Sequence, residues 1–201
     1  NGVPRDIIGT VDVHQPAEFD IVSFGRLKNH KRVDLLLHAL RTMKVSFGLT
    51  ARVAIVGDGP EREKLERIAR DTGVDSHVKF FGTIPDPASM YEVLKRSAIC
   101  VNTTMGGGGG NLSIFEANAC GLPVVAFKAE DGIDTELIEE GKSGLIVSPP
   151  NGEELARNLV SLLKDSDQLQ RMKEYSLTRS LQFDWGKTSD FYEQLFTGRM
   201  A

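Results

Sequence analysis

Short apolar runs alternate with amphipathic runs over most of this 201-residue chain, and no other feature restricts its fold as strongly. Such alternation is typical of a parallel sheet whose strands are joined by crossover helices. The apolar runs are short, as strands buried on both faces tend to be. We therefore predict an α/β fold, a Rossmann-like open parallel sheet with helices on both faces. The expected strands cover 20–24, 52–56, 78–81, 99–102, 124–127 and 144–147.

Helices are expected wherever apolar residues recur at helical spacing between or after these strands. Two amphipathic helices are predicted at 32–43 and 61–69. Asn151 can cap another helix, because Glu154 follows three residues later and completes a capping pair. A charged helix is expected at 167–179.

Composition excludes several classes of protein. Apolar residues make up 40% of the chain, and the net charge of −4 is scattered, so nucleic acid is not an expected partner. No apolar run approaches the roughly 20 residues of a membrane helix, and no secretory leader opens the chain, which indicates a soluble piece. Cys100 and Cys120 lie in apolar surroundings, which favours buried core positions in a reducing compartment over a disulfide or a metal cluster.

The first candidate site motif is FGRLKNHK, which follows the first expected strand. Ligands of open parallel sheets bind at the carboxyl ends of the strands. Gly25 allows a close backbone turn, while Arg26 and Lys31 add positive charge beside a helix start, a combination that suits a diphosphate. The alternative is that both cations are ordinary surface charges. For His30, beside Lys31, a plain loop position is favoured over a phosphate contact.

The second motif is the glycine run 106–110, followed by a helix expected to open near Leu112. Glycines ahead of a helix leave backbone N–H groups bare, so this segment is a phosphate cradle or, alternatively, a flexible loop. It lacks the Lys-Ser/Thr ending of a nucleoside triphosphatase loop. Glu116 falls one turn inside the helix among apolar residues, and a carboxylate there is expected to have a partner.

The third motif, FFGTIPDP, places Gly82 and a proline-bounded turn after the third expected strand. A turn of this kind can present backbone groups to a flat base. Alone it is a weak signal.

Taken in order, GRLKNHK, VGDGP, FFGTIP, FEANACGLPVV and GKSGLIV resemble the carboxyl-terminal domain of retaining glycosyltransferases of the GT-B fold, of the group 1 or family 4 type. The resemblance covers almost the whole chain. It implies that Arg26 and Lys31, as catalytic residues, hold the diphosphate of a nucleotide-sugar donor, and that Glu116 hydrogen-bonds the ribose. Backbone groups near Leu112 and Ser113 would touch phosphate. The implied substrate-binding residues are Gly25, Ile84, Gly110, Asn111, Leu112, Ser113 and Glu116.

The chain departs from the family pattern in one place. The family usually has a glutamate at the head of a loop that reads E-G-F-G, and here that position falls on Gly108, with Asn111 where the second glycine of the loop would be. The contact that this glutamate makes near the sugar is missing or supplied elsewhere. The identity of the sugar and full activity are therefore open.

The resemblance also implies the chemistry and the partners. The acceptor attacks on the face that the diphosphate leaves, with no protein nucleophile, so catalysis is mostly stabilisation of the departing diphosphate. No cofactor is expected, because the UDP- or GDP-sugar is a substrate. No metal is expected either, because this chemistry requires none and the sequence shows no His, Asp or Cys spacing that would build a metal site. The acceptor would bind a missing N-terminal domain, so we expect this chain alone to be inactive. The expected setting is polysaccharide or glycoconjugate synthesis in the cytoplasm, with any membrane association made through that domain.

Three rival functions remain at this point: a non-catalytic nucleotide-sugar-binding subunit, and a nucleotide-sugar epimerase or a glycogen-type phosphorylase of the same two-domain architecture. The chain begins with Asn1, and its first residues show neither helical nor strand periodicity. The resemblance indicates an interdomain linker remnant at 1–17, the nucleotide-sugar-binding domain at 18–182, and an aromatic C-terminal helix at 183–201 that packs on the domain or crosses from it.

Overall fold

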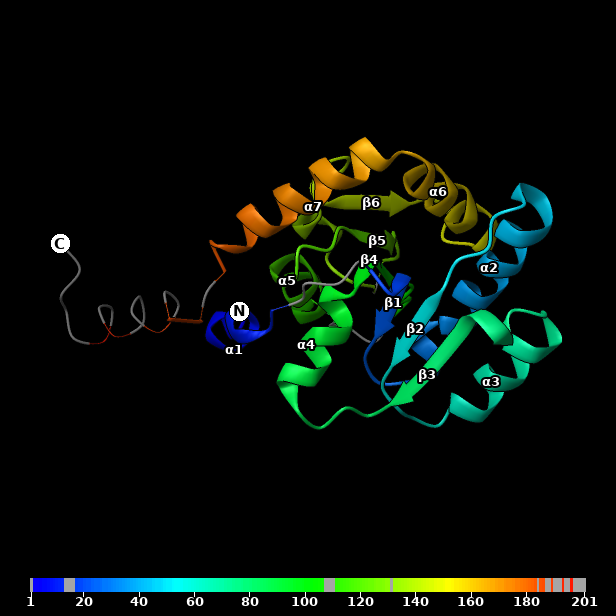
Figure 1. The fold of residues 1–201 in the computed structure, drawn as a ribbon, viewed down its shortest axis with the longest axis horizontal. Coiled ribbons are helices and arrows are strands. Elements are labelled where there is room, and N and C mark those ends of the chain that lie inside the picture. Colours follow the sequence, from blue (N-terminus) through cyan, green and yellow to red (C-terminus); the bar gives the residue numbers. More distant parts are fainter. Residues whose placement is uncertain are drawn as a thin grey trace.

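The protein forms one open sheet of six strands, all paired in parallel, in the order β3-β2-β1-β4-β5-β6 (Figure 1). The structure, a computed structural model, describes residues 2–12, 17–106, 111–130, 132–183, 185–186, 189, 193 and 196. The predicted α/β Rossmann-like fold is confirmed. The strands are β1 Phe19–Phe24, β2 Val53–Val56, β3 Val78–Gly82, β4 Ser97–Asn102, β5 Val124–Phe127 and β6 Gly144–Val147.

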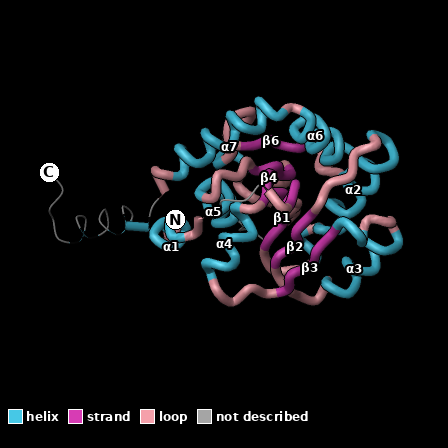
Figure 2. Tube along the Cα trace, viewed as in Figure 1, coloured by secondary structure: helices cyan, strands magenta, loops and turns pink. Residues whose placement is uncertain are grey.

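Helices cover both faces of this sheet, as Figure 2 shows by colour. Among the described residues no helix is both long and apolar enough to span a membrane. The α-helices are α1 Arg5–Thr10, α2 Val33–Phe47, α3 Arg62–Asp71, α4 Pro87–Lys95, α5 Asn111–Ala119, α6 Gly152–Lys164 and α7 Ser166–Ser180. Short 3-10 helices lie at η1 Asn29–Lys31, η2 Asp75–His77 and η3 Thr135–Leu137.

The core consists of two apolar layers, one on each face of the sheet. Because side chains alternate along a strand, Ile21 of β1 belongs to one layer and Val22 to the other. Helices α2, α3 and α6 cover the first layer, and α1, α4 and α5 cover the second. This two-sided burial explains why the strands are almost uniformly apolar.

The chain reverses its direction of strand addition at β1, which pairs with β2 on one side and β4 on the other. Ile21 lies opposite both Val53 and Ile99 in this pairing. At such a switch point the connections leave the two strands in opposite directions, which opens a crevice at their carboxyl ends. A ligand site is expected there.

Most predicted elements agree with the structure to within a few residues, and the predicted cap is present: Asn151 Oδ1 accepts a hydrogen bond from the Glu154 N–H at 2.9 Å. Helix α4 was not predicted, although Asp86 caps it and Pro87 occupies its first turn. The expectation that the first residues have no helical structure is wrong, because Arg5–Thr10 form α1 and Ile8 is buried in the second core layer.

The segment before α1 lies against the residues that directly follow α7. The Val3 N–H donates to the Phe183 carbonyl at 2.9 Å, and the Phe183 ring packs against Phe115 with centroids 4.5 Å apart. Phe196, by contrast, is 83% exposed. The domain boundaries, including the helix at 183–201, stay predictions.

Candidate functional site

A cavity of about 430 Å³ opens at the carboxyl ends of β1, β2 and β3, beside the first turn of α5. It brings together most of the predicted site residues from segments far apart in the sequence. Gly110 lies outside the described residues, and Asn111 is the first residue of α5. The lining residues are Phe24, Gly25, Arg26, Lys31, Val56, Gly57, Thr83, Ile84, Met90, Leu112, Ser113 and Glu116.

The floor of the cavity is a backbone contact between the turns that follow β1 and β2. Gly25 has a φ of +130°, and its N–H donates to the Val56 carbonyl at 2.9 Å. A Cβ at Gly57 would lie only 2.0 Å from the Gly25 carbonyl oxygen, and Gly57 itself has a φ of +126°. Both the contact and the backbone conformation therefore require glycine at this position.

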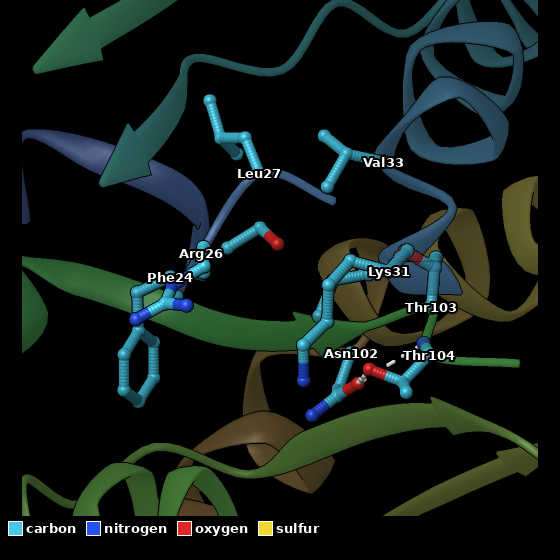
Figure 3. A pocket seen from close by; sticks show the side chains of 11 residues that line it. Phe24, Arg26, Leu27, Lys31, Val33, Asn102, Thr103 and Thr104 are labelled. Carbon is cyan, nitrogen blue, oxygen red and sulfur yellow. Dashed lines mark hydrogen bonds between the residues drawn. The ribbon is translucent and has the colours of Figure 1, made fainter. Parts of the chain in front are cut away.

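Two cations line the cavity without a protein counterion. Arg26 is exposed and Lys31 is half-buried, and within the described part of the chain neither side chain makes a hydrogen bond or an ion pair. Burial lowers the pKa of Lys31, because desolvation penalises its charged form. An anion bound in the cavity would offset this cost. In Figure 3 the Lys31 amine extends towards Asn102, and the Arg26 guanidinium lies beside Phe24.

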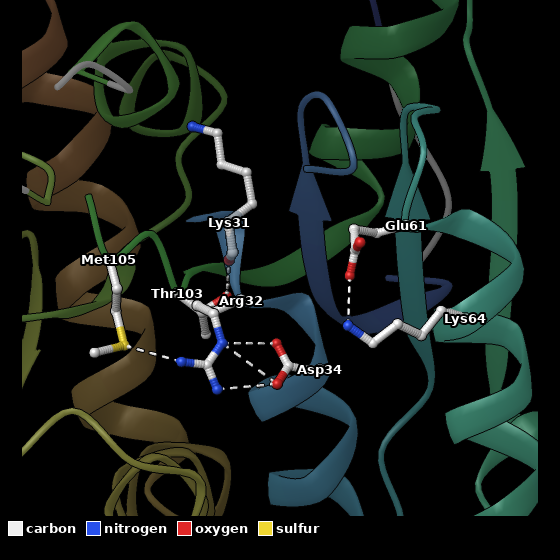
Figure 4. A network of polar contacts seen from close by, with 7 residues as sticks. All are labelled: Lys31, Arg32, Asp34, Glu61, Lys64, Thr103 and Met105. Carbon is white, nitrogen blue, oxygen red and sulfur yellow. Dashed lines mark hydrogen bonds and ion pairs between the residues drawn. The ribbon is translucent and has the colours of Figure 1, made fainter. Parts of the chain in front are cut away.

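The backbone around Lys31 is fixed by contacts to the segment after β4. The Thr103 hydroxyl donates to the Lys31 carbonyl at 2.7 Å, and the Met105 N–H donates to the His30 carbonyl at 2.8 Å. Arg32 has a φ of +46°, and its guanidinium forms a bidentate pair with Asp34, at 3.0 Å for each of the two closest contacts (Figure 4). His30 is not among the residues that line the cavity.

The first turn of α5 is attached to the end of β4 by Asn102. Its side-chain amide donates to the Ser113 hydroxyl at 2.9 Å, and its Oδ1 accepts from the Thr104 hydroxyl at 2.6 Å. Asn102 and Thr104 are buried, so this network is shielded from water. It holds Leu112 and Ser113 at the cavity, where backbone N–H groups at a helix start favour an anion.

Glu116 lies one turn further along α5, and the expectation that it has a partner is confirmed. The Tyr91 hydroxyl, from α4, donates to Glu116 Oε1 at 3.0 Å. Burial raises the pKa of Glu116, and the hydrogen bond from Tyr91 opposes this rise. The Tyr91 pKa is raised as well, first by burial and then by the nearby Glu116 carboxylate. The carboxylate is therefore a hydrogen-bond acceptor at the cavity wall.

The end of the cavity towards β3 is mostly apolar. Val56, Ile84 and Met90 line it, together with Thr83. The turn after β3 is tied to the turn after β2, because the Gly57 N–H donates to the Gly82 carbonyl at 2.8 Å. A flat, weakly polar group fits this end better than a charged one.

Several lining residues were missed by sequence reasoning. Thr83 directly follows β3, and Asn102, behind the cavity wall, is the last residue of β4. A polar residue at the carboxyl end of a predicted strand is a signal that could have identified both. Met90 and Tyr91 were missed because α4 was not predicted. Phe24 and Val56 read only as strand residues.

Both cysteines are buried and free, which confirms the prediction of core positions. Burial raises the pKa of each thiol, to about 12 for Cys120, so neither is a nucleophile near neutral pH. Within the part of the chain that the structure describes, no group of His, Cys, Asp and Glu side chains is arranged to hold a metal ion.

The fold and this site define the class of the protein. The sequence signature of the family "Glycosyl transferases group 1" matches residues 11–179. The chain belongs to this family. It is 33% identical over 150 residues to the GDP-mannose-dependent α-(1-6)-phosphatidylinositol monomannoside mannosyltransferase of Mycolicibacterium smegmatis, a match that covers 72% of this chain and 38% of that protein.

A second relative, the D-inositol 3-phosphate glycosyltransferase of Corynebacterium urealyticum, is 31% identical over 191 residues, which cover 90% of this chain and 43% of that protein. The chain thus spans about two fifths of the length of these relatives.

Two solved structures share the fold. Anabaena HepE in complex with UDP has a TM-score of 0.79 and 22% identity, and the match covers 98% of this chain and 56% of HepE. The C-terminal domain of the group 1 glycosyl transferase LpcC from Francisella tularensis has a TM-score of 0.72 and 21% identity, over 88% of this chain and 95% of that domain.

The glycine contact on the cavity floor yields a first prediction. Gly57→Ala should lower the free energy of unfolding by about 2–4 kcal/mol, because a Cβ would collide with the Gly25 carbonyl in a strained conformation. The melting temperature should fall by about 5–15 °C in a thermal melt. Gly73→Ala is the control, since Gly73 also has a positive φ, of +67°, but no atom lies within 4 Å of its Cβ position. Equal losses for the two variants would contradict the proposed contact.

Proposed function

We propose that this chain is the donor-binding part of a retaining glycosyltransferase, which holds a nucleoside-diphosphate sugar by its diphosphate and its ribose. The observation that carries the proposal is a pair of cations, Arg26 and Lys31, which have no counterion among the described residues and face the first turn of α5 across one cavity. Family membership supports the same reading.

The diphosphate is assigned to the cationic part of the cavity. Lys31 lacks a counterion among the described residues and is half-buried, so a phosphate oxygen would compensate its desolvation. Arg26 offers a planar set of donors suited to phosphate. The N–H groups at the start of α5 add donors and the positive end of the helix dipole.

The nucleoside is assigned to the rest of the cavity. Glu116 Oε2 makes no hydrogen bond with any described residue, so it is available to the ribose hydroxyls. The apolar end beside Ile84 and Met90 suits the base. This order, from diphosphate through ribose to base, follows the cavity from Lys31 past Glu116 to the turn after β3.

The proposed reaction needs little covalent chemistry from this chain. The bond between the anomeric carbon and the diphosphate breaks, and the acceptor hydroxyl forms a new bond to that carbon on the same face. The acceptor proton passes to the departing diphosphate oxygen. Arg26, Lys31 and the helix start stabilise the charge that develops on the diphosphate, a preorganised electrostatic effect that often dominates catalysis.

In this proposal the donor is a UDP-sugar or a GDP-sugar, so the base is uracil or guanine. One curated relative is named as GDP-mannose-dependent, whereas HepE was crystallised with UDP. Isothermal titration of the chain with UDP and with GDP distinguishes the two.

A non-catalytic nucleotide-sugar-binding subunit is the second candidate function, because Gly108 stands where the family usually has its first glutamate. Gly108 lies outside the described residues. Sugar transfer from a panel of UDP- and GDP-sugars by the full-length protein would exclude this candidate, and nucleotide binding without any transfer would favour it.

The cationic assignment yields a second prediction. Lys31→Gln should weaken binding of UDP or GDP by about tenfold or more, because one charge-assisted phosphate contact contributes about 1.5–3 kcal/mol. Lys64→Gln is the control, since Lys64 lies on α3 and pairs with Glu61 at 2.7 Å. Titration calorimetry measures both variants. A nucleoside diphosphate that binds the Lys31 variant as tightly as the wild type would refute the diphosphate assignment.

The ribose assignment yields a third prediction. Glu116→Ala should weaken nucleotide binding by roughly tenfold to a few hundredfold, since charged hydrogen bonds contribute about 1.5–3 kcal/mol each. The 2′,3′-dideoxy nucleotide should bind the wild type and the variant about equally. Equal losses for both nucleotides, together with a lower melting temperature, would show that Glu116 supports the scaffold instead.

A further inference from the structure

Helices α4 and α5 meet behind the cavity wall through one side-chain hydrogen bond. Tyr91, on α4, is only 3% exposed, and its hydroxyl donates to Glu116 Oε1 at 3.0 Å. Its neighbour Met90 lines the apolar end of the cavity, so consecutive residues of α4 serve two adjoining parts of the same site. This hydrogen bond occupies Oε1 of Glu116, while Oε2 makes no hydrogen bond with any described residue.

A glutamate side chain has several rotatable bonds, and ordering it during binding costs conformational entropy. The Tyr91 ring is enclosed by the second core layer, so its hydroxyl has a fixed position. A fixed donor on Oε1 removes much of the rotational freedom of the carboxylate before any ligand arrives. Preorganisation of this kind increases affinity without a direct contact to the ligand.

We propose that Tyr91 is a positioning residue of the nucleotide site: its hydroxyl holds Glu116 Oε1, so that Oε2 is presented to the ribose hydroxyls. This inference rests on the proposed function. Helix α4 would then orient the Glu116 carboxylate of α5 that accepts from the ribose hydroxyls. The same helix supplies Met90 to the end of the cavity assigned to the base.

The charge state of Glu116 depends on the groups around it. Tyr91 faces it from α4, Cys100 from β4 and Cys120 from the turn that directly follows α5, while Arg26 and Lys31 line the same cavity. The two thiols stay neutral because their pKa values are raised. The Tyr91 hydrogen bond favours the carboxylate, so its loss should raise the Glu116 pKa further.

The test is Tyr91→Phe, which keeps the buried ring and removes the hydroxyl. Affinities are measured by calorimetry for UDP and 2′,3′-dideoxy-UDP from pH 5 to 8, or for the GDP pair if the wild type binds GDP more tightly. The ratio of the two dissociation constants cancels the titration of the diphosphate itself. We expect the preference for the ribose nucleotide to fall about threefold to tenfold.

The pH dependence of this ratio separates positioning from scaffolding, because a purely structural role of Tyr91 would not shift it. Ribose hydroxyls donate more strongly to the charged Glu116 carboxylate than to its protonated form. The preference for the ribose nucleotide over the dideoxy nucleotide should therefore be full above the Glu116 pKa and decline as pH falls through it. In Tyr91→Phe the decline should occur at higher pH than in the wild type. In a Glu116→Ala background, Tyr91→Phe should have no further effect on the ratio.

The control is Tyr175→Phe, which removes the same type of bond elsewhere: the Tyr175 hydroxyl of α7 donates to Glu139 Oε2 at 2.6 Å. The Tyr175→Phe variant should have the same nucleotide preference and the same pH profile as the wild type. The melting temperature of each variant shows whether it is folded. A Tyr91 variant with unchanged ratio and unchanged profile would overturn the inference alone. A wild type that binds neither UDP nor GDP would overturn the proposed function first.

Discussion

Parallel pairing of β1 with both β2 and β4 is the constraint on which the rest of this structure depends. It sends all carboxyl strand ends to one edge and separates the connections on either side of β1. The glycines after β1 and β2 then bring two backbone turns into contact and form the floor of the cavity. Arg26, Lys31 and the first turn of α5 line the cavity above that floor, because they follow strands whose carboxyl ends meet at this edge.

The charges of the site follow from this arrangement. Many surface cations of this chain have carboxylate partners, such as Arg52 with Asp20 and Arg62 with Glu66. Arg26 and Lys31 have none within the described residues, although they lie beside a helix start that is itself positive. An uncompensated positive cluster costs folding free energy, and an anion bound there would offset this cost. Glu116, whose Oε1 accepts a hydrogen bond from Tyr91, supplies the only carboxylate among the lining residues that the structure describes.

The sequence predicted much of this because the relevant signals are local. Short, uniformly apolar runs and the glycine turns after them indicate buried strands and their carboxyl ends, which placed Gly25, Arg26, Lys31 and Glu116 at one edge. Helix α4 was missed because its signals, Asp86 and Pro87, were interpreted as a turn. Partnerships across the fold, such as Tyr91 with Glu116, depend on how two helices pack on the sheet. One sequence carries no local signal for such a contact.

A crystal structure of the chain with bound UDP or GDP tests the central claim most directly. We expect the diphosphate between Lys31 and the N–H groups at the start of α5, and a ribose hydroxyl within hydrogen-bond distance of Glu116 Oε2. A nucleotide bound instead in the smaller cleft beside Phe19, Phe81 and Arg96, or one whose ribose lies away from Glu116, would contradict it.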